Sequence, residues 1–174
     1  PQTDFIGDAG ITVTVTDGTL EDSGSFTLTV SPVNDAPVLA EISAQEIAED
    51  SSLVIVLSAV DIDGDTLSYS AESEELNLTI LVSSDTLLVT PAANWTGTAI
   101  VAVTVDDGSG SDNATDTGTF MLAVTPVNDA PVLTVPLGGV SIYEDIPEAV
   151  AVDRLEDYFS DPDTGDTLSF TAIL

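Results

Sequence analysis

The sequence contains no cysteine and no histidine, so the chain forms no disulfide and lacks the side chains that zinc prefers. Basic residues are almost absent, since Arg154 stands against 31 aspartates and glutamates and the formal net charge is −30. Phosphate recognition needs clusters of Lys and Arg, which excludes a nucleic-acid partner. No apolar run is long enough to span a bilayer, so membrane insertion is not expected either.

The same absences argue against catalysis. Without His, Cys or Lys the chain has few nucleophiles and proton-transfer groups, and it shows no Gly-rich phosphate loop. Paired carboxylates hydrolyse glycosides in some enzymes. Here, however, the same acids recur in each internal repeat, which favours a structural role. We therefore expect a protein that is not an enzyme.

Short apolar runs dominate what is present. Val, Ile, Leu and Thr alternate with polar residues, and clusters of Gly, Asp, Asn and Ser separate the runs, which predicts an all-β fold. The few aromatic residues, among them Phe26, Tyr69, Trp95 and Phe120, are expected in the core. The predicted strands cover residues 11–16, 25–30, 53–59, 67–71, 76–82, 87–90, 99–105 and 119–125.

The chain contains an internal repeat. The octapeptide Pro-Val-Asn-Asp-Ala-Pro-Val-Leu begins at residue 32 and again at residue 126, which gives a repeat of 94 residues (126 − 32). This length suits a seven-strand Greek-key β-sandwich. We expect the C-terminal part of one module in residues 1–37, a complete module in 38–131 and the N-terminal part of a third in 132–174. The chain then resembles a window on a longer polypeptide.

Oxygen-bearing side chains recur with the repeat. One group, Asp61, Asp63 and Asp65, ends an apolar strand and returns as Asp161 and Asp163. Three carboxylates held together are costly unless a cation lies among them, and Ca²⁺ is the hard cation that prefers oxygen ligands. The other groups are the two Asn-Asp pairs in the predicted joints between modules, and two single acids. These residues are Asn34, Asp35, Asn128, Asp129, Asp107 and Glu49. Each motif alone is also typical of a simple turn.

These motifs together resemble cadherins and the bacterial cadherin-like, tandem Ig-like repeats of large calcium-dependent surface adhesins. The Val-Asn-Asp-Ala-Pro joint, the Asp-x-Asp before a Tyr-bearing strand, and the late Asp107-Gly108 carry the resemblance. It implies calcium between modules, bound at the first joint by Asn34, Asp35, Asp61, Asp63 and Asp107. At the second joint it implies Asn128, Asp129, Asp161, Asp163 and Glu49 as ligands.

The sequence departs from animal cadherins in two ways. Ala130 replaces the second amide of the linker, and the acidic motif in the middle of the module is not recognisable. Fewer ions at each joint are therefore expected.

The resemblance implies a calcium-rigidified extracellular stalk or adhesive module on a bacterial cell surface. The alternative is a module that binds a surface glycan or a protein ligand. Its expected partners are neighbouring modules of the same protein, and the two partial modules predict head-to-tail self-association. Filaments would result if the tail of one copy completed the head of another.

Overall fold

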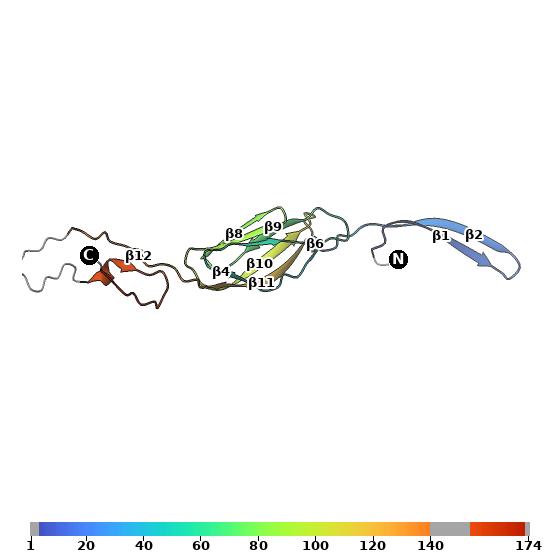
Figure 1. Ribbon diagram of the computed structural model, residues 1–174. Coiled ribbons are helices and arrows are strands. Elements are labelled where there is room, and N and C mark those ends of the chain that lie inside the picture. Colours follow the sequence, from blue (N-terminus) through green and yellow to red (C-terminus); the bar gives the residue numbers. More distant parts are fainter. Residues whose placement is uncertain (1–3, 140–153, 173–174) are drawn as a thin grey trace, which may run out of the picture.

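The computed structural model describes residues 4–139 and 154–172. It confirms the all-β prediction, because its elements are strands apart from one 3-10 turn at Leu155–Asp157. Figure 1 shows a row of three parts: an N-terminal hairpin, a central β-sandwich and a C-terminal segment. In the part of the chain that is described, no helix is both long and apolar enough to cross a bilayer.

The central sandwich consists of two sheets and a short ladder. The larger sheet has the strand order β4 (Gln45–Ala48), β11 (Thr115–Thr125), β10 (Gly97–Asp106), β7 (Ser68–Glu72). The smaller has the order β5 (Leu53–Val56), β9 (Thr86–Pro91), β8 (Leu78–Ser83). The ladder pairs β3 (Val38–Leu39) with β6 (Ala59–Val60).

The predicted strand at 53–59 is divided in the structure. Its first half, β5, pairs with β9, and its second half, β6, pairs with β3. The chain therefore changes partners at Leu57, whose N–H donates to the Asp85 carbonyl oxygen (2.7 Å). Such a change of partners lets one stretch of chain form the edge strand of two different sheets at the corner of a sandwich.

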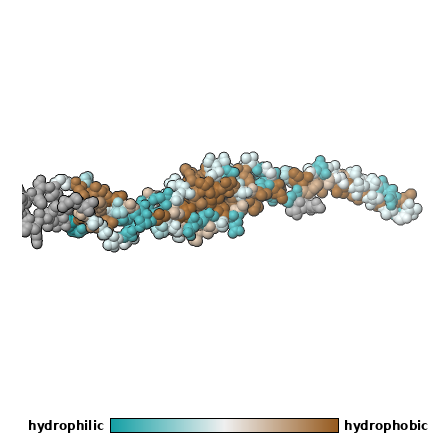
Figure 2. Space-filling model, viewed as in Figure 1, coloured by the Kyte–Doolittle hydropathy of each residue, from teal (hydrophilic) through white to brown (hydrophobic). Residues whose placement is uncertain are grey.

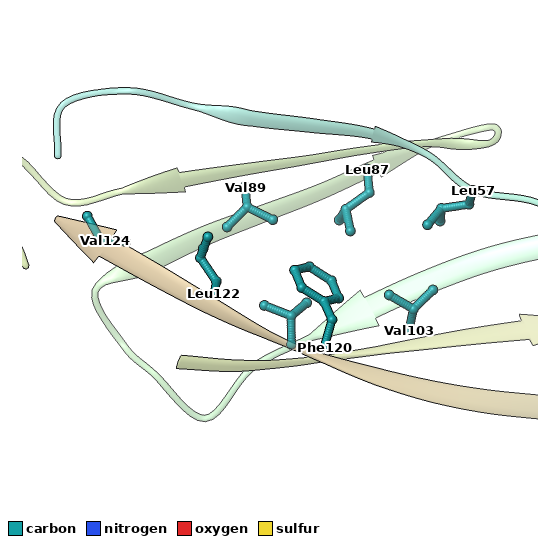
Figure 3. Close-up of a cluster of buried hydrophobic side chains, with 8 residues drawn as sticks. Leu57, Leu87, Val89, Val103, Phe120, Leu122 and Val124 are labelled. Atoms are coloured by element: carbon teal, nitrogen blue, oxygen red, sulfur yellow. The ribbon is translucent and has the colours of Figure 1, made fainter. Parts of the chain in front are cut away.

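The core lies between the two sheets, where alternate residues of each strand point inward. Leu87 and Val89 of β9 face Phe120 and Leu122 of β11, and Val103 of β10 completes the layer (Figure 3). Phe120 is 4% exposed and Leu122 is fully buried. Tyr69 and Trp95 pack against this cluster, so their predicted place at the core is confirmed.

The N-terminal hairpin consists of β1 (Gly7–Thr16) and β2 (Glu21–Val30). Its register repeats that of β10 and β11, since Ile11 lies opposite Phe26 as Val101 lies opposite Phe120. Phe26 is nevertheless 56% exposed. Its prediction as a core residue is therefore wrong for this structure, because no second sheet faces the hairpin within the described residues.

The C-terminal segment repeats the beginning of the sandwich. β12 (Val132–Leu133) pairs with β13 (Phe159–Ser160) in the register of the β3–β6 ladder. Phe159 packs on Phe170, with ring centroids 5.6 Å apart and planes tilted by 55°. A tilted pair at this distance is a favourable aromatic contact.

Candidate metal centres at the module joints

The first joint ties the linker to two loops of the sandwich. The side-chain amide of Asn34 donates to Asp107 Oδ2 (2.9 Å), and the backbone N–H of Asp35 donates to Asp63 Oδ2 (2.8 Å). Asn113 Nδ2 donates to the Asn34 carbonyl oxygen (2.6 Å). The loop after β6 and the turn between β10 and β11 therefore both hold the linker.

Asp61, Asp63 and Asp65 form a carboxylate cluster at this joint. One oxygen of each lies within 4.8 Å of the others. Asp61 Oδ1 accepts hydrogen bonds from the N–H groups of Gly64 (3.0 Å) and Asp65 (3.2 Å). Asp61 Oδ2 is buried and has no hydrogen-bond partner in the structure. A buried carboxylate oxygen without a partner is costly, and a bound cation would supply the partner that this oxygen lacks.

Asp107 is buried at the same joint, with 5% of its surface exposed. The Asn34 amide, followed by the Ser109 N–H (2.7 Å from Oδ1), lowers the pKa of this carboxyl below its ordinary value. Both donors stabilise the charged form. Asp107 therefore presents a carboxylate to the joint.

The second joint repeats the local structure of the first. The Asp129 N–H donates to Asp163 Oδ2 (2.6 Å), as Asp35 donates to Asp63. Asn128 Nδ2 donates to the Asp129 carbonyl oxygen (3.0 Å), which repeats the bond from Asn34 to Asp35 (3.1 Å). Within the described residues, no hydrogen bond links the Asn128 side chain to another candidate ligand. The two copies of the octapeptide therefore adopt the same local conformation at the two joints.

Two carboxylate clusters meet at the second joint and share Asp163. One joins Glu49 and Asp129 to Asp163, and the other joins Asp161 and Asp166 to Asp163, with one oxygen of each residue within 4.8 Å of the others in its cluster. Glu49 is buried, and its Oε1 accepts the Val127 N–H (2.7 Å). Figure 2 shows a hydrophilic band where the chain leaves the sandwich for the C-terminal segment.

Two further residues support Asp129 from the sandwich. Asn94 Nδ2 donates to Asp129 Oδ2 (2.5 Å), and the Asn94 N–H donates to Asp50 Oδ1 (3.1 Å). Asp50 and Asn94 both have left-handed backbones, with φ of 57° and 55°. Asp and Asn tolerate this conformation better than most residues, so both loops can turn sharply beside the joint.

Four residues at the joints are not among the predicted ligands: Asp50, Asn94, Asn113 and Asp166. Asp166 is the repeat counterpart of Asp65, so the repeat alignment contained the signal for it. Asn94 and Asn113 carried no such signal, because each meets a linker residue far away in the sequence. Hydrogen bonds and carboxylate clusters place the predicted residues in two groups: Asn34, Asp35, Asp61, Asp63, Asp65 and Asp107 at the first joint, and Glu49, Asn128, Asp129, Asp161 and Asp163 at the second. Their role as metal ligands stays a prediction.

No basic side chain neutralises these clusters in the described structure. Arg154 is the one basic residue of the chain, and its Nε lies 3.2 Å from Glu156 and 3.6 Å from Asp157. Neighbouring carboxylates repel one another unless one is protonated or a cation lies between them. The donor set consists of carboxylate and amide oxygens, which suits a hard divalent cation.

Comparison with known proteins gives one family match. The family model described as bacterial Ig domain matches residues 34–122. A search of the curated proteins finds no match.

Solved structures that match part of the chain include Drosophila N-cadherin EC1-4, at 19% identity and a TM-score of 0.45, covering 82% of this chain and 40% of that one. Human mucin-like protocadherin EC1-2 is 21% identical with a TM-score of 0.43, covering 68% of this chain and 69% of that one. An endo-fucoidan hydrolase of glycoside hydrolase family 107 is 20% identical with a TM-score of 0.43, over 70% of this chain. This chain spans only 19% of that hydrolase.

Proposed function

The chain belongs to the bacterial Ig domain family, and we propose that it is an extracellular structural repeat whose joints bind calcium. The bound ions restrict bending between modules and stiffen a stalk at a bacterial surface. One observation carries the proposal. At both joints the linker N–H of an Asn-Asp pair is bonded to an Asp-x-Asp loop, and carboxylates gather there without a basic partner.

The clustered oxygens are close enough together for one calcium ion to contact several of them. Ca–O distances of about 2.3–2.6 Å place two oxygens on opposite sides of one ion about 5 Å apart. The clustered oxygens lie within 4.8 Å of one another at each joint. Asp61, Asp63 and Asp65 would hold the ion at the first joint, and the unpartnered Asp61 Oδ2 is the oxygen most in need of it.

The two joints contain different parts of one proposed ligand set. At the first joint, Asp107 belongs to the module that follows the linker, and at the second joint, Glu49 belongs to the module that precedes it. A complete joint then draws ligands from the upstream module, the linker and the downstream module. Binding to such a set depends on the angle between modules, so calcium selects one angle.

Calcium titration by isothermal calorimetry tests this proposal. We expect dissociation constants of about 10⁻⁴ to 10⁻³ M, the range of extracellular calcium modules. Asp63→Asn should remove the binding at the first joint, and Asp163→Asn the binding at the second. Glu46→Gln, an exposed change on β4, is the matched control. Binding that is equal in all four proteins, or absent from the unmodified chain, would contradict the proposal.

A glycan-binding or protein-binding role is the alternative function. Sugar sites commonly present an exposed aromatic ring, whereas Trp95 packs against the core of the sandwich. Its six-membered ring packs over Gly97, where an added methyl group would lie 3.1 Å from the ring. The observation favours the structural role, and binding on a glycan array would favour the alternative.

A further inference from the structure

One edge of the larger sheet of the sandwich is only partly paired. β10 runs from Gly97 to Asp106, but β7 pairs with it only from Ala102 onward. β7 ends at Glu72, and the chain then continues to β8 in the other sheet. Within the described residues, no strand lies beside the first part of β10 on this edge. This stretch therefore keeps backbone groups without a strand partner.

Two side chains show which backbone groups of β10 point toward this edge. The Ser73 hydroxyl donates to the Ile100 carbonyl oxygen (2.7 Å), and the Ser68 hydroxyl donates to that of Asp106 (3.4 Å). The even-numbered residues of β10 therefore direct their backbone groups to the β7 side, because the direction alternates along an antiparallel strand. The N–H and C=O of Thr98 and the N–H of Ile100 consequently face the open edge.

A groove of about 680 Å³ follows this edge. Its volume lies in the range of ligand-binding clefts, about 300–1,000 Å³. Residues of β10 line one side, namely Thr98, Ala99, Ile100 and Ala102, and residues 72–75 line the other. The Ile100 side chain is 66% exposed. The groove thus combines an open strand edge with an apolar surface.

The groove is lined by carboxylates and by no basic side chain. Its acids are Glu72, Glu74 and Glu75. Glu75 Oε1 accepts the N–H and the side-chain amide of Asn77 (2.9 and 2.7 Å), whereas no hydrogen bond or ion pair of the described structure engages the side chains of the other two. The three acids do not form a group whose oxygens lie within 4.8 Å of one another. They therefore suit separate positive charges along the groove better than a single metal ion.

We propose that this groove binds an extended, basic peptide segment of a partner protein. The segment adds as a strand beside Thr98 and Ile100, in line with β7. Backbone hydrogen bonds give such strand addition its affinity, and the alternate side chains give it specificity. Lysine or arginine at alternate positions lies on one face of an extended segment, where it can meet the carboxylates of Glu72 and Glu74.

Charge identifies the partner as a different polypeptide. Residues 1–174 of a second copy supply no basic segment, because their one basic residue is Arg154, which lies 3.2 Å from Glu156. The net charge of −30 also makes two copies repel each other, whereas it attracts a cationic segment. The groove lies on the central sandwich and contains none of the candidate calcium ligands. It therefore stands or falls separately from the proposed function.

Calorimetric titration with a synthetic peptide of alternating lysine and valine tests the site, at physiological salt and in chelator. The double variant Glu72→Gln with Glu74→Gln should weaken binding about tenfold. Glu41→Gln with Glu46→Gln is the matched control, since it removes two exposed charges and Glu46 lies on β4 at the opposite edge of the sheet. The control should change the affinity less than about twofold. Equal losses in the two variants, or no binding to the unmodified chain, would overturn the proposal.

Backbone methylation of the same peptide tests strand addition. Alternate N–H groups of a strand point to opposite sides, so only one alternate set pairs with the edge of β10. N-methylation of that set should weaken binding about tenfold or more, and N-methylation of the other set should change it little. The two methylated peptides carry the same charge. Similar affinities for both would mean that the peptide is held by charge alone, and strand addition would then be wrong.

Discussion

Asp163 is the residue on which the second joint depends most. It accepts the Asp129 N–H and belongs to both carboxylate clusters, whereas Asp166 belongs to one. Asp163→Asn should therefore abolish most of the calcium-dependent rise in melting temperature that this joint supplies, and Asp166→Asn only part of it. Thermal melts with calcium and with chelator measure both. A larger loss from Asp166→Asn would contradict the assignment of the shared ligand.

Asp107 makes the first joint sensitive to acid. Its pKa lies below the ordinary 3.8, because the Asn34 amide and then the Ser109 N–H stabilise the carboxylate in the folded state. A lowered folded pKa contributes stability above the unfolded pKa, and this contribution disappears as the pH falls through the folded pKa. In chelator, the stability difference between the natural chain and Asp107→Asn should be constant above about pH 5 and shrink on acidification from about pH 4 downward.

Urea unfolding of the two proteins across this range measures the effect. Protonation of the other carboxylates reduces repulsion in both proteins, so this effect on the free energy of unfolding drops out of the difference between them. A difference that grows as the pH falls would contradict the predicted sign.

At the scale of elements, the β1–β2 hairpin and the β10–β11 hairpin have the same register but differ in burial. Leu122 on β11 is fully buried, and its counterpart Leu28 on β2 is 46% exposed. Leu122→Ala should lower the free energy of unfolding of the sandwich by about 2–5 kcal/mol, from lost transfer energy and the remaining cavity. Leu28→Ala should leave this free energy unchanged.

Urea denaturation at low protein concentration, where copies do not associate, measures both changes. Similar costs for the two substitutions would mean that the hairpin is covered in solution, against the described structure.

The sequence predicts strands well where alternation is strong. Residues 99–105 and 119–125 lie in β10 and β11, since one face of each is fully buried and the pattern is clear. The prediction was wrong for Phe26, because alternation indicates which face is apolar but not whether a second sheet covers it. The break between β5 and β6 was also missed, since both halves are equally apolar and only pairing with β3 separates them.

The joints were predictable to the extent that they repeat. Asn34, Asp35, Asp61, Asp63 and their counterparts were found because the same motif occurs twice at a fixed spacing. The support of Asp129 by Asn94 was not predictable, because it depends on how the loop before β10 turns. Whether these oxygens hold calcium stays a prediction for the titration to test.

At the scale of the whole molecule, the large negative charge opposes the folded state. With a net charge of −30 on 174 residues, the folded chain repels itself at low ionic strength. In chelator, raising the salt from 0.01 M to 0.15 M should raise the melting temperature, because the screening length falls from about 30 Å to about 8 Å. With millimolar calcium the rise should be smaller, since bound ions already neutralise the joints.

Scanning calorimetry in the four buffers measures this difference. An identical salt response with and without calcium would contradict neutralisation at the joints.

The stiffness of the second joint tests the central claim most directly, because its clusters join Glu49 of the sandwich to Asp163 beyond the linker. Spin labels at Thr119→Cys on β11 and Thr171→Cys in the C-terminal segment lie on opposite sides of the joint, and the chain offers no other cysteine for labelling. The distance distribution between them, measured by pulsed electron spin resonance in dilute protein, should be broad in chelator and narrow in millimolar calcium. Asp163→Asn should keep it broad in both. Equal widths for the unmodified joint with and without calcium would contradict the account.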